Sequence, residues 1–171
     1  KVQAKNALVS AGNFTMDNSS GAVTSAGKKA TLIEMTINPQ YSIDVSSLGG
    51  ITANSISMIG NNIGFGVRNN GSIISNSSLQ LTSYGNLLNK GTIKGNGLLS
   101  QVSTVTGITN EGSIGGANYL MLSSGDYIVN VGSITGGQLI ATANGNITNG
   151  DSGTMTGTSG LSLASGGKIR N

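Results

Sequence analysis

The chain has 171 residues, of which 9% are charged and 4% aromatic, and its formal net charge is +3. It contains neither His nor Cys, which excludes a disulfide scaffold, thiolate metal sites and a histidine-based catalytic triad. The basic residues are scattered and no aromatic residues interleave with them, so we expect no nucleic-acid binding. Hydrophobic residues still make up 36%. They are mostly Ile, Leu and Val, which favour strands.

The first 60 residues carry a blurred repeat. Two stretches within residues 2–9 alternate as strands do, and a turn follows them. Residues 17–40 are polar and irregular, and then apolar around Leu32. We therefore expect a loop or hairpin there that projects from the main fold. Strand-like alternation resumes within residues 51–59.

From Arg68 onward a repeat of about 20 residues is plain, and such periods are typical of solenoids. The pattern Asn-x-Gly-Ser/Thr-Ile recurs, with a looser copy near residue 150, and successive asparagines are 20, 21, 20, 19 and 22 residues apart. We expect these asparagines at the corners of successive coils. They are Asn69, Asn89, Asn110, Asn130, Asn149 and Asn171.

Apolar residues hold fixed places before each asparagine. The residue two before it is Val, Leu or Ile, and those eight and ten before it are apolar except for Ser100. A polar or small residue separates the latter two, as in a strand with one buried face. Each repeat thus offers three short strand segments separated by Gly, Asn and Ser corners. The sequence predicts an all-β parallel β-helix with three-sided coils.

Inward side chains of such a fold stack on their counterparts one coil away, about 4.8 Å along the axis. The recurring asparagine has two interpretations: an amide ladder between coils, or tolerance of a left-handed corner. The Gly two residues after it suits a corner that needs a backbone conformation closed to other residues. Length variation falls mostly between the Ile and the next Leu pair, where we expect a surface loop.

The acidic residues are too dispersed to predict a catalytic pair. Glu111 and Asp151 follow repeat asparagines two coils apart, which places their backbones roughly 10 Å apart. Asp44 is expected to form a turn, and Arg68 to be an exposed charge or the partner of Asp44. We therefore predict no enzyme, no cofactor and no metal site. The six acids are Asp17, Glu34, Asp44, Glu111, Asp126 and Asp151.

One stretch carries a resemblance to a known family. Residues 41–56 read Tyr-Ser-Ile-Asp-Val-Ser-Ser-Leu-Gly-Gly-Ile-Thr-Ala-Asn-Ser-Ile, and residues 64–69 read Gly-Phe-Gly-Val-Arg-Asn. Together they resemble the end of the secretion domain and the start of the filament in two-partner-secretion exoproteins. That family includes filamentous hemagglutinins, hemolysin-like exoproteins and contact-dependent growth-inhibition proteins. The Asn-x-Gly-Ser/Thr-Ile copies resemble its hemagglutinin repeats, whereas the Asn-Pro-rich motifs of its secretion domain have no good copy here.

The resemblance implies a right-handed parallel β-helix divided at about residue 60. Residues 1–60 would be the C-terminal part of a secretion-type β-helix with its projecting loop, and residues 61–171 would be hemagglutinin-repeat coils. It further implies a secreted, bacterial cell-surface protein exported through an outer-membrane transporter of the Omp85 type. The expected role is a rigid filament for adhesion or for presenting a contact-dependent toxin, with an unidentified receptor on host cells or bacteria. We expect the chain to be a monomer.

Two other functions are weighed against this one. The first is a passive secretion and folding module, which would concentrate function before residue 70. The second is a carbohydrate-active β-helix enzyme, which would need acids clustered on one side.

Overall fold

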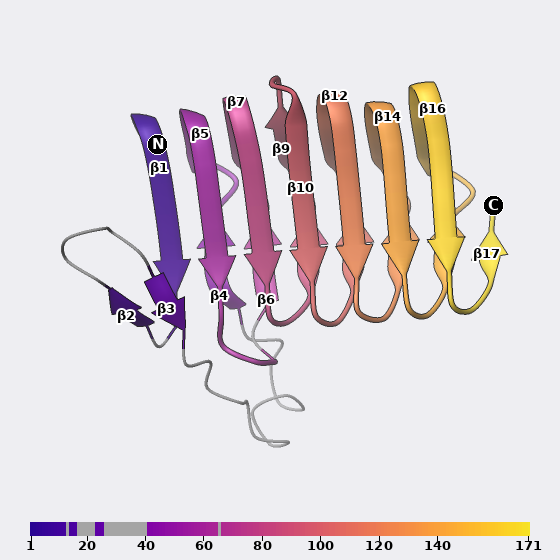
Figure 1. Ribbon diagram of the computed structural model, residues 1–171, viewed down its shortest axis with the longest axis horizontal. Coiled ribbons are helices and arrows are strands. Elements are labelled where there is room, and N and C mark those ends of the chain that lie inside the picture. The colour runs from indigo at the N-terminus through magenta and orange to yellow at the C-terminus, as the bar shows by residue number, and fades with distance from the viewer. Residues whose placement is uncertain (13, 17–22, 26–40, 65) are drawn as a thin grey trace.

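The computed structural model describes residues 1–12, 14–16, 23–25, 41–64 and 66–171. All regular structure in these ranges is β, and no helix there is long and apolar enough to cross a membrane. The chain forms a parallel β-solenoid of about six turns with a spacing of about 21 residues, which confirms the predicted fold. Figure 1 shows the coils side by side from the N-terminus to the C-terminus, wound in a right-handed sense.

The larger sheet follows the order β1-β5-β7-β10-β12-β14-β16, and β9 pairs with both β7 and β12. All these pairings are parallel. The bounds are Val2–Ala11 (β1), Gly50–Gly60 (β5), Ser72–Ser83 (β7), Thr92–Gly95 (β9), Leu99–Thr104 (β10), Ser113–Ser124 (β12), Ser133–Ala143 (β14) and Thr154–Ser165 (β16).

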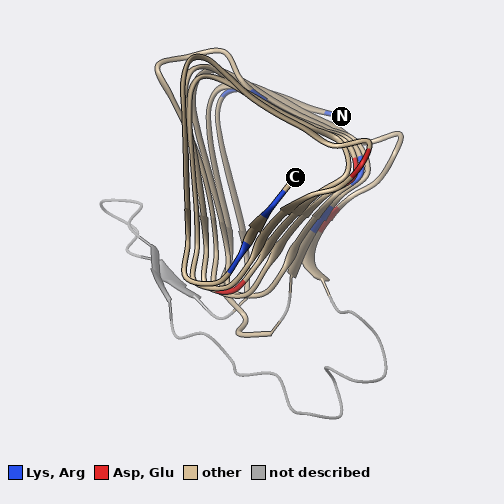
Figure 2. Cartoon of the chain, turned by 90° about the vertical axis from the view of Figure 1, so that its right-hand side faces the viewer, with Lys and Arg blue, Asp and Glu red and all other residues tan. Residues whose placement is uncertain are grey.

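The smaller sheet follows the order β17-β15-β13-β11-β8-β6-β4 and is also parallel. It forms the third side of the triangular cross-section in Figure 2. Its strands are Tyr41–Val45 (β4), Gly66–Asn69 (β6), Leu87–Asn89 (β8), Ile108–Asn110 (β11), Ile128–Asn130 (β13), Ile147–Asn149 (β15) and Ile169–Arg170 (β17).

Most coils contain two strands rather than the three predicted segments. The first two sides merge into one strand of 11 or 12 residues in β7, β12, β14 and β16, and only the coil of β9 and β10 keeps them apart. The merged strands bend at a corner where the register shifts, as between Gly116 and Tyr119 in β12. The length differences between coils fall at this corner, but the strand continues through it in β7, β12, β14 and β16, so the expected surface loop is wrong for these coils. A strand can turn there without losing its ladder because the shift adds a single residue.

The interior is a column of stacked apolar side chains. Ile73, Ile93, Ile114 and Ile134 share one register position and are fully buried. The positions ten, eight and two before each asparagine are likewise buried in the central coils, which confirms the predicted inward register.

The expected projecting loop lies mostly outside the described residues, since 17–22 and 26–40 are not among them. The two short segments that are described, β2 (Phe14–Met16) and β3 (Val23–Ser25), pair with each other in antiparallel fashion.

Candidate functional site

The structure brings the six repeat asparagines into one line along a corner of the solenoid. Each Nδ2 donates to the Oδ1 of the asparagine one coil further on, and all five of these bonds are 2.7 Å long. The first four side chains are fully buried. Stacked amides of this kind stabilise parallel in-register strands, and hydrogen bonds in a low-dielectric interior reinforce one another.

Each amide also satisfies the backbone of its corner. The Nδ2 of Asn89 donates to the Gly91 carbonyl at 3.2 Å and to the Ser113 carbonyl at 3.0 Å. Equivalent bonds recur at Asn110 and Asn130. None of the described non-glycine residues has a positive φ. The ladder therefore accounts for these asparagines, and the left-handed-corner interpretation is wrong.

The glycine two residues after each of the first four ladder asparagines has a different role from the one predicted. Among the described residues only Gly12 and Gly64 have a positive φ. A Cβ at Gly91 would lie 2.0 Å from the Gly71 carbonyl oxygen, and one at Gly112 would lie 2.1 Å from the Gly91 oxygen. Close approach of the backbones of successive coils, rather than a special backbone conformation, requires glycine here.

Sequence reasoning missed a second polar corner. Ser83, Thr104, Ser124 and Ser165 stand six residues before a ladder asparagine, and Ala143 takes that place in one coil. The Ser124 Oγ is close to two backbone carbonyls, those of Thr106 at 2.7 Å and Tyr127 at 2.8 Å. Hydroxyl groups at this corner therefore satisfy the carbonyls of the turn. The signal was present in the sequence as a small hydroxylated residue at fixed spacing.

Asp44 does not form a turn. It lies in β4 opposite Arg68 of β6, because the parallel register places the two side chains one coil apart on the same outward face. The Arg68 Nε donates to the Asp44 Oδ1 at 3.0 Å, and a second Arg68 nitrogen contacts Oδ2. This hydrogen bonding holds the pKa of the Asp44 carboxyl below its ordinary value and raises that of the Arg68 guanidinium. The guanidinium carbon also lies 4.8 Å from the Tyr41 ring centroid. Arg68 is thus the partner of Asp44, one of the two roles predicted for it.

The other predicted charges do not form a catalytic pair. Glu111 contacts Lys90, with 3.1 Å between Oε2 and Nζ, on the corner that follows the ladder. Asp151 lies in the turn after Asn149, two coils further on. Within the described ranges, no three His, Cys, Asp or Glu residues are grouped so as to hold a metal ion.

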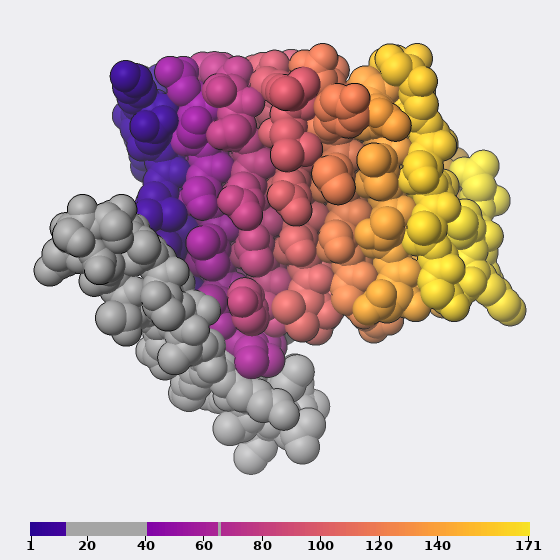
Figure 3. All heavy atoms as spheres, in the orientation of Figure 1, coloured from indigo at the N-terminus to yellow at the C-terminus, as the bar shows by residue number. Residues whose placement is uncertain are grey.

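One face of the solenoid has no charge. It consists of the outward positions in the second half of β1, β5, β7, β10, β12, β14 and β16, three from each strand, beginning with Asn6, Leu8 and Ser10 of β1. All 21 are uncharged. We call it the uncharged face. It is turned toward the viewer in Figure 3 and forms the left side of the triangle in Figure 2, where no charged residue is coloured.

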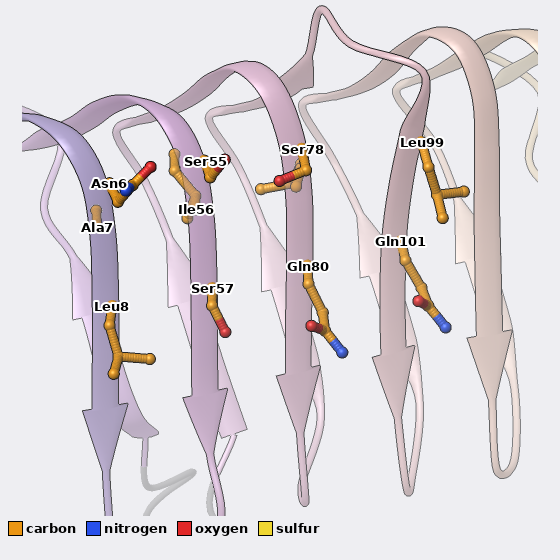
Figure 4. Close-up of a pocket in the computed structure, with 11 residues that line it drawn as sticks. Asn6, Ala7, Leu8, Ser55, Ile56, Ser57, Ser78, Gln80, Leu99 and Gln101 are labelled. Atoms are coloured by element: carbon orange, nitrogen blue, oxygen red, sulfur yellow. The ribbon is translucent and has the colours of Figure 1, made fainter. Parts of the chain in front are cut away.

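A groove of about 470 Å³ crosses the uncharged face over its first four strands. Ser55 and Ser57 of β5 form its floor because their side chains are small, and Leu8 of β1 and Leu99 of β10 stand on either side. Figure 4 shows Leu8, Ser57, Gln80 and Gln101 in one row across the four strands. The groove runs along the solenoid axis, so this face is the candidate binding surface of the molecule.

Comparison of the chain with family models, with curated proteins and with solved structures found no match.

Proposed function

We propose that this chain is a non-catalytic, rod-forming segment of a large secreted bacterial surface exoprotein, serving adhesion or the presentation of a contact-dependent toxin. The observation that supports it best is the unbroken stack of coils with one register and one ladder. Each coil adds about 4.8 Å to the rod. Because a coil buries its apolar side chains only against its neighbours, length and stability grow together. A spacer that holds a binding or toxic domain away from a cell needs these properties.

The stretches that resemble two-partner-secretion exoproteins support the same proposal. Residues 41–56 span β4 and the first part of β5, and residues 64–69 include β6. They form the first coils of the stack and contain the Asp44–Arg68 pair. We infer that the parent protein is exported to the cell surface through an outer-membrane transporter of the Omp85 type. The absence of cysteine suits export in an unfolded state, because no disulfide can trap a premature fold.

The test is binding of the purified chain to host cells and to sibling bacteria, after circular dichroism has shown a β-rich spectrum. Saturable binding to one cell type is expected for an adhesive segment. The matched control is the Leu122→Asp variant, which should lose the solenoid and its binding together. Absence of binding by the folded chain to either cell type would refute adhesion by this segment.

The toxin-presenting role has its own readout. Growth inhibition of sibling bacteria by producing cells should weaken when coils are deleted in whole repeats from the parent protein, because the rod becomes shorter without losing its register. Inhibition that is unchanged after such deletions would contradict the role of this segment as a spacer.

A further inference from the structure

The uncharged face is unusually straight. Viewed along the solenoid axis, the coils superimpose closely, so the face hardly twists from one strand to the next (Figure 2). Sheets that extend flat over many strands are typically stabilised by stacking on another sheet. The charged residues of the described ranges lie on the other two sides and at the corners. Charge repulsion therefore does not oppose the approach of a second uncharged face.

The face carries an apolar ridge beside its groove. Leu99 of β10 is 41% exposed, and Tyr119 and Met121 of β12 are 44% and 38% exposed. Exposed aromatic and Met side chains without neighbouring charges are typical of the core of a protein interface. The groove is centred between β5 and β7, and the ridge lies two strands further along, between β10 and β12. A face that carries both a ridge and a groove at a fixed offset can be complementary to a second copy of itself.

We propose that two copies of this chain pair through their uncharged faces, with their solenoid axes antiparallel. The two-fold axis lies in the interface, parallel to the strands and midway between β7 and β10. This operation places β10 of one copy opposite β7 of the other, β12 opposite β5, and β14 opposite β1. The ridge of each copy then fills the groove of its partner, and both contacts form at once.

The side chains that meet in this arrangement match in size and polarity. Three large apolar side chains face small serines, two amides face amides, and two aliphatic side chains face each other. The predicted opposing pairs are Tyr119 with Ser55, Met121 with Ser57, Leu99 with Ser78, Gln101 with Gln80, Gln138 with Asn6, and Ile140 with Leu8.

The size of the face fits a reversible dimer. Six strands at about 4.8 Å and five residues at about 3.3 Å give roughly 29 Å by 17 Å, about 500 Å² of flat area per copy. With its side-chain relief the pair approaches the lower end of specific interfaces, about 1,200 Å² in total. On this proposal the chain is in a concentration-dependent equilibrium between monomer and dimer, whereas the sequence led us to expect a monomer. A two-fold axis along the solenoid instead of across it is disfavoured, because it would set one groove against the other and leave both empty.

Cysteine cross-linking tests the arrangement directly, because the chain has no cysteine of its own. Leu8 and Ile140 lie five strands apart on one chain, roughly 24 Å, but face each other between copies. The double variant Leu8→Cys/Ile140→Cys should give a covalent dimer with a short bis-maleimide, whereas neither single variant should. Cross-linking of Leu8→Cys alone would overturn the antiparallel arrangement, since it requires two copies of residue 8 to meet.

Sedimentation equilibrium over a wide concentration range gives the independent measurement. Ser57→Lys puts a charge into the groove opposite Met121 and should raise the dimer dissociation constant at least about tenfold. The matched control is Thr109→Lys, on an outward position of the smaller sheet, which should leave the constant unchanged. Both variants should keep the melting temperature of the unaltered chain, because neither position is fully buried. A chain that stays monomeric at every concentration, or equal weakening by both lysines, would overturn the proposal.

Discussion

The first coil and the central coils of the solenoid share one register but differ in two respects. The position of the ladder asparagine is taken by Val45 in the first coil, opposite Asn69 in the second. The first coil is also an end, so Val9 is only partly buried, whereas Leu122 at the same register position in a central coil is almost fully buried. The comparison shows that the sequence pattern determines which way a side chain points. How much that side chain contributes to stability depends on whether a coil covers it on both sides.

The largest expected effect comes from a charge in the stacked interior. Leu122→Asp should cost more than about 4 kcal/mol, because the carboxylate would be almost fully buried among apolar side chains. Val9→Asp, in the same column of the first coil, should cost far less, since its carboxylate can reach solvent. Thermal melts followed by circular dichroism measure both.

The neighbouring residue supplies the control for that comparison. Met121 points outward beside Leu122 and is 38% exposed. At a concentration where the chain is monomeric, Met121→Asp should leave the melt within about 2 °C of the unaltered chain, because surface substitutions change stability by about 0.5 kcal/mol or less. Equal melts for Leu122→Asp and Met121→Asp would show that the inward register is wrong.

The ladder gives the next effect in size. Asn110→Val copies into a central coil the residue that the first coil has at Val45. It removes the Asn110 acceptor of the Asn89 Nδ2 and the Asn110 donor to the Asn130 Oδ1, and should cost about 3 kcal/mol. Urea denaturation measures the loss, with Thr109→Val, an adjacent outward position, as the control.

The reverse substitution, made in the first coil, tests the contribution of the ladder to stability from the other direction. Val45→Asn extends the ladder by one rung toward Asn69, whose Oδ1 already accepts from the Gly71 amide. Its stability should stay within about 1 kcal/mol of the unaltered chain, because the new hydrogen bond offsets the lost apolar burial. A loss as large as that of Asn110→Val would mean that the ladder contributes nothing beyond its fit to each corner.

The features predictable from the sequence were those that every coil repeats. Stacking needs the same kind of residue at the same place, so the period, the inward column and the line of asparagines were visible in spacing alone. Whether Asn89 joins a ladder or adopts a left-handed conformation depends on its backbone angles. Whether Gly91 is needed for a positive φ or for close packing depends on its distance from Gly71. Neither is encoded in spacing. The uncharged face was hidden for another reason: side chains such as Leu8 and Ile140, far apart in the sequence, come to lie on one face only once the strands are in register.

The coil of β9 and β10 differs from the other central coils at Ser100, which stands between Leu79 and Leu120 in the buried column. Within the described part of the chain its Oγ is buried without a hydrogen-bond partner. Ser100→Ala should therefore stabilise by about 1 kcal/mol and raise the melting temperature by about 3 °C. Ser124→Ala is the matched control, since that buried Oγ is hydrogen-bonded and its removal should destabilise. The same sign for both variants would contradict this account of Ser100.

The smallest expected effect concerns the surface ion pair of Asp44 and Arg68, which joins the first coil to the second. Both side chains are about 40% exposed, so Asp44→Asn should lower the melting temperature by less than about 2 °C at neutral pH, and by less still at high salt. The folded-state pKa of Asp44 lies below its ordinary value of 3.8, so the contribution is present above that value and is lost as the pH falls through the lower folded pKa. Melts of Asp44→Asn and the unaltered chain should differ at pH 6 and converge in acid well below pH 3.8. A difference that persists in acid would assign the effect to packing around Tyr41 rather than to charge.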